Sequence, residues 1–238
     1  MGRNRMVGRI EHDAKELDDA LPSWLRPDGP ESRFPVAIAI LVAVALQFSI
    51  PDSYGLHPRW LIPSLELVLL AVLVIVNPVR LSRSTTVGRY ASYTLVAAIT
   101  LDNTFSAVFL DHAILTGKTG DDALGLLASG AAIYLTNVIA FGIWYWELDR
   151  GGPFARAAGK KVYPDFMFPQ MGNPELAPPN WTPTFVDYLY VSITNVVAFS
   201  PTDTMPLSKW AKALMTLQSA VALSTTALVI ARAVNVLK

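Results

Sequence analysis

The sequence contains no cysteine and, for its 238 residues, little charge of either sign. Without cysteine, the chain has no disulfide, no thiolate metal site, no iron–sulfur cluster and no cysteine nucleophile. Its 19 basic and 19 acidic residues cancel, which disfavours bulk binding of nucleic acid. Only 16% of the residues are charged and 52% are hydrophobic, whereas soluble domains carry about 25% charged residues. This composition predicts an all-α polytopic membrane protein that lies in a lipid bilayer.

Motifs of common enzymes are also missing. The three histidines, His12, His57 and His112, stand alone, so the HExxH arrangement of zinc hydrolases is absent. The segment 117–119 (GKT) resembles the end of a phosphate-binding loop, but His112 occupies the position of the first glycine of that loop. No GxSxG sequence occurs either. We therefore expect no enzyme activity, no cofactor and no bound metal.

Apolar runs divide the chain into four parts. Residues 1–33 form a polar tail, and residues 34–146 contain four runs of about the 17 to 25 residues that a bilayer crossing requires. Residues 147–181 are rich in proline and glycine, which predicts a long connector without a continuous helix. Residues 182–238 hold a shorter, more polar run and then a long one. The expected membrane segments are 34–50, 59–77, 89–112, 123–146, 182–199 and 207–237.

The positions of the basic residues predict the orientation. Thirteen lysines and arginines lie in the tail, in the loop 78–89 and at the start of the connector, and Arg59 and Lys118 lie on the other side. Short loops with lysine and arginine stay in the cytoplasm, so we expect the tail and the connector there. A segment 182–199 that crosses the bilayer gives six spans, and a re-entrant one gives five. The pattern is that of a multi-pass protein of a cell membrane, such as the bacterial inner membrane.

The C-terminal part contains an ordered set of residue types. A short segment, 188–197, is followed by the turn 198–202 and then by Asp203, Pro206 and Lys209, without a gap. This order resembles the pore module of the tetrameric potassium-channel superfamily, in which a pore helix precedes a filter, an aspartate, a proline and a basic residue that opens the inner helix. It is also similar to bacterial membrane-protein families with four spans before such a module. The resemblance covers about 55 of the 238 residues.

The resemblance implies a homo-oligomer, a tetramer in that superfamily, with the turn at a shared axis through which monovalent cations pass. The filter-like residues are Thr194, Ala198, Phe199, Ser200, Pro201, Thr202 and Asp203. A potassium filter needs glycines, but serine and threonine stand at those positions and Pro201 restricts the backbone between them. A ring of hydroxyls and Asp203 carboxylates therefore predicts a weakly selective cation pore. The alternative is that the SPTD sequence only turns the chain.

One face of the last apolar run carries regularly spaced polar groups. Its members recur at steps of three and four, as on one side of a helix: Gln218, Ala222, Thr225, Val229 and Arg232. This stripe is the pore-lining candidate, and the alternative is a contact between helices. No glycine occurs between residues 207 and 238, so the glycine hinge of many channel inner helices is missing.

Four polar residues interrupt the first four apolar runs: Glu66, Asp102, Asn103 and Asn137. Such residues are costly in lipid and are functional candidates for that reason. Glu66 and Asp102 lie roughly 10 to 15 Å from the same side, so their carboxyls can share one depth. Such a pair would share a proton or bind a cation, and the alternative is a protonated acid in a hydrogen bond between helices.

The run WYWELDRGG, residues 144–152, combines aromatic and charged residues at the end of a membrane segment. This pattern is typical of an interfacial anchor, with Glu147, Asp149 and Arg150 solvated or paired. Three functions remain in competition: a cation pore, a non-conducting membrane scaffold or sensor that lost its filter, and a proton-coupled carrier that uses Glu66 and Asp102.

Overall fold

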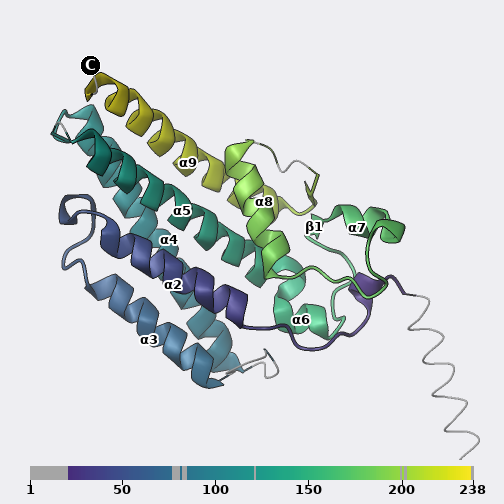
Figure 1. Ribbon diagram of the computed structural model, residues 1–238. Coiled ribbons are helices and arrows are strands. Elements are labelled where there is room, and N and C mark those ends of the chain that lie inside the picture. Colours follow the sequence, from purple (N-terminus) through teal and green to yellow (C-terminus); the bar gives the residue numbers. More distant parts are fainter. Residues whose placement is uncertain are drawn as a thin grey trace, which may run out of the picture.

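The computed structural model describes residues 21–76, 81, 85–120, 122–198, 200 and 203–236. This part of the chain is a bundle of helices with short irregular elements at one end (Figure 1). Each bundle helix lies inside or close to one of the expected apolar segments, so the prediction of a mainly helical chain is confirmed. The bundle helices are α2 (Phe34–Ser49), α3 (Leu61–Val76), α4 (Thr86–Leu115), α5 (Ala123–Leu148), α8 (Phe185–Val197) and α9 (Lys209–Val236).

Short polar side chains fix where three of these helices start. Thr85 Oγ1 accepts a hydrogen bond from the backbone N–H of Gly88 at 3.0 Å at the start of α4. Asp122 Oδ1 accepts one from the N–H of Gly125 at 2.9 Å at the start of α5. α8 begins with a capping box formed by Thr184 and Asp187. These caps satisfy N–H groups that the first turn of a helix leaves without partners.

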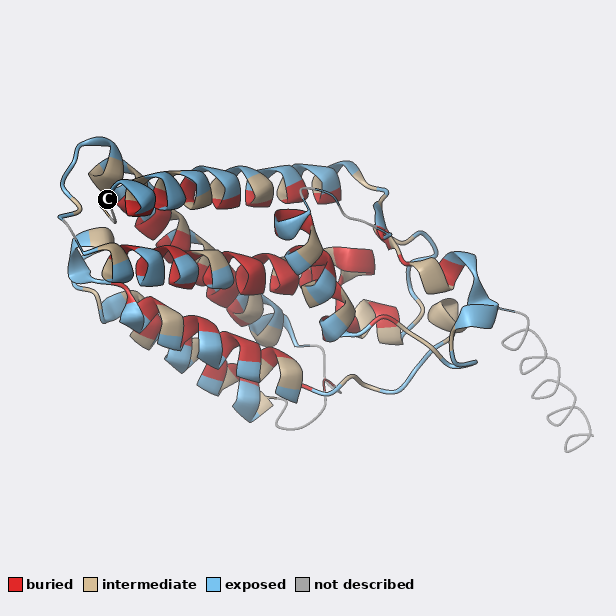
Figure 2. Cartoon of the chain, turned by 45° about the horizontal axis from the view of Figure 1, so that its top comes forward, coloured by how far each residue is buried: buried red, intermediate tan, exposed pale blue. Residues whose placement is uncertain are grey.

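The helix α5 lies at the centre of the bundle. It packs against α2, α4, α8 and α9, and every residue from Thr136 to Ile143 is buried (Figure 2). A Cβ atom added at Gly130 would lie 2.9 Å from Val229 Cγ1 on α9, and one added at Gly142 would lie 3.2 Å from the Cα of Leu189 on α8. The two C-terminal helices therefore rest directly on glycine positions of α5.

Three helical segments are long and apolar enough to cross a membrane: α4, the segment Ala123–Ala157 that contains α5, and α9. The helices α2 and α3 are apolar too, but each has 16 residues. Large apolar side chains, among them Leu101, Val108 and Ile230, are exposed on the outside of the bundle. Exposed apolar surface of this kind is unfavourable in water. The low content of charged residues, the length of the apolar helices and the exposed apolar surface are together typical of a membrane protein.

The helix α8 and the chain after it form a hairpin within the bundle. Phe185, at the start of α8, lies with its ring against Trp146 near the end of α5. Val196, near the end of α8, packs with Val138 and Ala222, which lie in the middle parts of α5 and α9. The helix therefore runs antiparallel to α5 and ends about halfway along the bundle.

The chain then returns to the end from which α8 started. The strand β1 (Phe166–Met167) pairs antiparallel with β2 (Met205–Pro206). The N–H of Leu207 donates to the carbonyl of Asp165 at 2.8 Å. As a result, α8 and α9 begin at the same end of the bundle. We call this the connector end, because it also carries the connector and residues 21–33.

The connector contains only short elements, as its prolines and glycines predicted. They are η3 (Asp149–Gly151), α6 (Pro153–Ala157), β1, α7 (Pro169–Gly172) and η4 (Pro174–Leu176), with η1 (Ser23–Leu25) of the tail close by; η2 (Asp52–Tyr54) joins α2 to α3 at the opposite end. Phe166 anchors the connector, because its ring contacts Tyr145, Tyr188 and Trp210 at centroid distances of 5.1 to 6.2 Å. The sequence alone did not predict the pairing of β1 with β2.

We expect Gly142→Leu to destabilise the protein by about 1 to 3 kcal/mol, because the new side chain would press on the α8 backbone. Ala131→Leu places the same residue on the exposed side of α5 and should leave stability nearly unchanged. Thermal unfolding of both variants in detergent provides the measurement. Equal unfolding temperatures would show that α8 does not rest on this glycine.

Candidate functional site

A buried hydrogen-bond network joins α5, α8 and α9 around Gln218. Gln218 is fully buried, and its Oε1 accepts from the hydroxyl of Tyr145 at 2.6 Å and from Nδ2 of Asn195 at 2.8 Å. Its Nε2 donates to Ser192 Oγ at 2.6 Å, and this hydroxyl donates in turn to the carbonyl of Val138 at 2.7 Å. Such a satisfied network holds one arrangement of the three helices.

The stripe predicted to line a pore faces the chain's own helices. Its first four residues are buried: Gln218, Ala222, Thr225 and Val229. Thr225 Oγ1 donates to Asp111 on α4 at 3.4 Å, and Arg232 Nη2 donates to the carbonyl of Gly120 at 2.9 Å. Within the single chain, this stripe is therefore a contact between helices. The repeat of three and four residues indicated that these side chains share one face of α9, but it did not indicate which helices cover that face.

The opposite face of α9 is exposed and carries small residues. They recur at steps of three and four along the helix: Ala213, Thr216, Ala220, Ser224, Ala227 and Ala231. Larger apolar side chains, Leu217, Leu223 and Ile230, flank them and are exposed as well. We call these six small residues the outer α9 stripe. Small residues let membrane helices approach closely, so this face is suited to contact with another helix.

The filter-like turn is described in part. Thr194 lies on α8, where its hydroxyl donates to the carbonyl of Tyr190 at 3.0 Å. Ala198, Ser200 and Asp203 are exposed on the surface of the single chain. Phe199, Pro201 and Thr202 lie outside the described residues.

A second buried group, the carboxyl cluster, lies between α2, α3 and α4. Glu66 is fully buried and accepts from Nε2 of Gln47 at 3.2 Å, whereas Asp102, 2% exposed, pairs with Arg59 at 3.6 Å. Arg59 also donates to the backbone carbonyl of Gln47 at 2.6 Å and to Ser106 Oγ at 3.4 Å. The two carboxyls thus belong to one cluster, as their predicted depths indicated. Arg59, which the sequence places in a loop, is thus part of a buried cluster.

The other two polar candidates, both asparagines, take no part in the pair of Arg59 and Asp102. Asn103 and Asn137 are both 2% exposed, and within the described residues the side-chain carbonyl oxygen of each has no hydrogen-bond partner. The same holds for Glu66 Oε2 and Asp102 Oδ2. The carboxyl cluster is therefore only partly satisfied, which leaves hydrogen-bonding capacity inside the bundle.

A third group, the connector cluster, lies where the connector meets α5 and α8. Asp149 is fully buried, and its Oδ2 accepts from the hydroxyl of Tyr188 at 2.6 Å while its Oδ1 accepts from the N–H of Asp165 at 2.8 Å. Arg156 Nη1 donates to the Asp149 carbonyl at 3.0 Å, and its guanidinium lies 4.9 Å from the Tyr188 ring centroid. Arg150, 1% exposed, donates to the Lys161 carbonyl at 2.9 Å.

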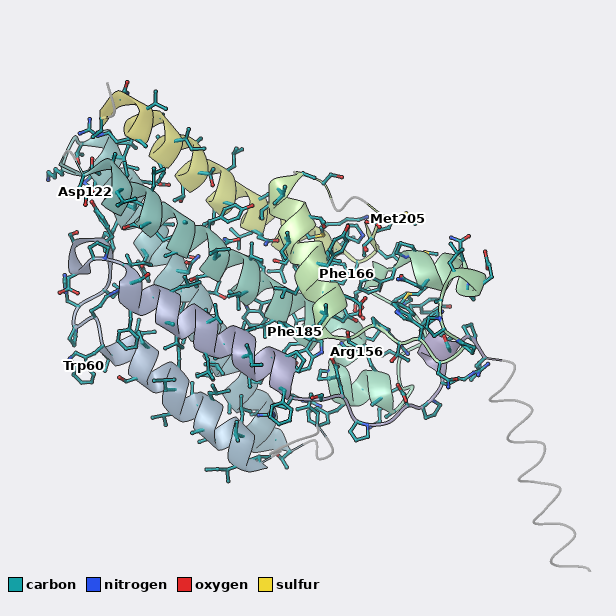
Figure 3. The ribbon with its side chains drawn as sticks, in the orientation of Figure 1. Trp60, Asp122, Arg156, Phe166, Phe185 and Met205 are labelled. Carbon is teal, nitrogen blue, oxygen red and sulfur yellow. The ribbon has the colours of Figure 1, made fainter. Side chains whose placement is uncertain are left out.

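Glu31 ties the tail to this cluster. Its carboxylate accepts from the N–H of Phe185 at 2.7 Å and from the indole of Trp146 at 2.8 Å. Burial raises the pKa of the Glu31 carboxyl, and the Arg156 guanidinium opposes that change. Figure 3 shows Arg156, Phe166 and Phe185 gathered at the connector end, and Trp60 and Asp122 at the opposite end.

For residues 144–152 the sequence left open whether the charges are solvated or paired, and the structure has them buried and hydrogen-bonded. Glu147, Asp149 and Arg150 are 8%, 0% and 1% exposed, with partners on Ser92, Tyr188 and Lys161. One local signal for this fold was present in the sequence, namely the glycine pair after Arg150. Gly152 has φ 94°, and a Cβ there would lie 2.8 Å from the Glu147 carbonyl.

Comparison of the chain with protein-family models, with curated proteins and with solved structures finds no match.

We expect Arg59→Gln to destabilise the protein by about 3 to 5 kcal/mol, because the buried Asp102 carboxylate loses its cation. The double variant Arg59→Gln, Asp102→Asn should recover most of that loss. Thermal unfolding of the two single variants and the double variant gives the coupling energy between the residues. Additive effects in this cycle would mean that the pair does not stabilise the bundle.

Proposed function

We propose that this chain has five membrane spans and one re-entrant helix, and that several copies assemble around the re-entrant hairpin to form a weakly selective cation pore. The observation that supports this most is that α8 and α9 begin at the same end of the bundle. In this arrangement α2, α3, α4, α5 and α9 cross the bilayer. The segment expected as 182–199 enters and leaves on one side.

The length of α8 supports the re-entrant assignment. Its 13 residues extend about 20 Å at 1.5 Å per residue, whereas the hydrocarbon layer is about 30 Å thick. The chain then returns to β2 at the connector end. A helix of this length, followed by a strand at the end where the helix began, can enter and leave the membrane on the same side.

The position of the turn supports assembly of several copies. The turn 198–203 follows a helix that ends halfway along the bundle, and Ala198 and Ser200 are exposed in the single chain. Non-helical backbone at membrane depth is tolerated only where protein covers it or where it lines a water-filled cavity. Neighbouring copies that meet at the turn supply such cover. The outer α9 stripe lies on the face that is left for this contact.

The chemistry around the turn favours cations. Serine and threonine hydroxyls and the Asp203 carboxylate, repeated around an axis, present oxygen atoms and negative charge to an ion. The outer α9 stripe adds the hydroxyl oxygen of Thr216 on the exposed face of the last helix. The Pro201 position and the missing glycines disfavour selectivity for potassium.

The carrier function has less support. It requires Glu66 and Asp102 to exchange protons or ions, but Asp102 is paired with Arg59 and Glu66 accepts from Gln47. These contacts give the two carboxyls a structural role in holding α2, α3 and α4 together.

The proposed orientation rests on the distribution of basic residues along the sequence, and the natural absence of cysteine makes it easy to test. We expect Lys160→Cys to react with an impermeant thiol reagent only after the cells are opened. Lys118→Cys, at the opposite end, is the matched control and should react on intact cells. Labelling of Lys160→Cys on intact cells would contradict a cytoplasmic connector.

Pore activity is tested with purified protein in liposomes under a potassium or sodium gradient. We expect passive flux of both ions through the natural chain and at least a tenfold loss in Ala220→Phe, because the ring would fill the contact at the outer α9 stripe. Ala128→Phe, on the exposed side of α5, is the matched control and should conduct normally. An oligomer without flux under either gradient would refute the pore and favour the scaffold. A monomer in detergent and in lipid would refute both assembly and pore.

A further inference from the structure

A narrow apolar cavity of about 40 Å³ lies at the connector end of the helices α2, α3, α4 and α5. Its walls include the side chains of Val36, Ile40, Leu70, Leu73 and Leu95. All five belong to residues that pack in the main core of the bundle.

The guanidinium of Arg33 lines this cavity and is unusual among the arginines of the bundle. Arg33 is only 9% exposed, its Nε is buried, and within the described residues its side chain makes no hydrogen bond and no ion pair. Arg150 and Arg156, which are buried to a similar degree, both donate to backbone carbonyls. Glu147, in the same cavity, is the opposite charge that attracts Arg33, but without a hydrogen bond or a close ion pair in the described part of the chain the guanidinium keeps hydrogen-bonding capacity that the single chain does not use.

A second arginine lies at the same cavity. Arg89, on the first turns of α4, lines it and is exposed. The acidic group among the lining residues is Glu147, and its carboxylate already accepts a hydrogen bond from Ser92. The lining residues therefore include two guanidinium groups and one carboxylate, which leaves the polar part of the cavity with an excess of positive charge.

We propose that this cavity binds an anionic phospholipid, with the phosphate between Arg33 and Arg89 and part of one acyl chain between the helices. A free phosphate ion could contact the two arginines but not the apolar walls, whereas a phospholipid can contact both. The cationic groups distinguish an anionic lipid from a zwitterionic one. The position also fits, because the cavity lies at the ends of four membrane helices, where lipid phosphates lie.

The test uses the full chain in detergent and native mass spectrometry. Phosphatidylglycerol and phosphatidylcholine with identical acyl chains are titrated in parallel, and we expect phosphatidylglycerol to bind at least tenfold more tightly. Arg33→Gln should abolish this preference, and Arg89→Gln, a change at an exposed position, should reduce it even if the first variant folds poorly. Lys160→Gln removes the same charge from the connector outside the cavity and should keep the preference.

Two further measurements separate a lipid site from a simple anion site. Ala37→Phe narrows the apolar part without a change of charge and should weaken binding of phosphatidylglycerol. Glycerol phosphate, which carries the charge without acyl chains, should not displace the lipid at equal concentration. Equal binding of the two lipids, an unchanged preference in both arginine variants, or displacement by glycerol phosphate would each overturn the proposal.

Discussion

The close packing of α8 and α9 on α5 is the constraint on which the rest of the structure depends. Glycine at positions 130 and 142 lets the two helices approach without a side chain between them. Gln218 then meets Tyr145, Asn195 and Ser192 within hydrogen-bond distance. Because this network is fully buried, it stabilises one relative position of the three helices.

Long-range contacts explain what the sequence predicted and what it missed. The helices were predictable because apolar runs of span length have few alternatives in lipid. The inward face of α9 was also visible as a repeat of three and four residues. The residues that pack against that face could not be predicted, because Gln218 bonds to Ser192 and Tyr145, which lie 26 and 73 positions away in the sequence. The same limit applies to Arg59, which reaches Asp102 from outside its helix, and to Glu31, which meets the N–H of Phe185 across 154 residues.

Buried charges in this chain fall into two kinds. Asp149 and Arg156 are surrounded by donors and acceptors from the connector, the tail and α8, so their burial is compensated within the chain. Arg33 lies at the same end of the bundle without such compensation. Burial of a charge costs free energy unless a partner is present, so the contrast separates side chains whose hydrogen bonds are made within the chain from the one on which the proposed lipid site rests.

The pairing of β1 with β2 has a consequence for motion. Two residues of the connector pair with Met205 and Pro206, which lie two residues before α9, and Trp210 on the first turn of α9 donates to Asp165 of the connector at 2.9 Å. The connector cannot shift along the bundle unless α9 shifts with it or these bonds break. The connector is thus mechanically coupled to the last helix. A molecule that displaced the connector would exert its force on β2 and the start of α9, which follow the turn in the sequence.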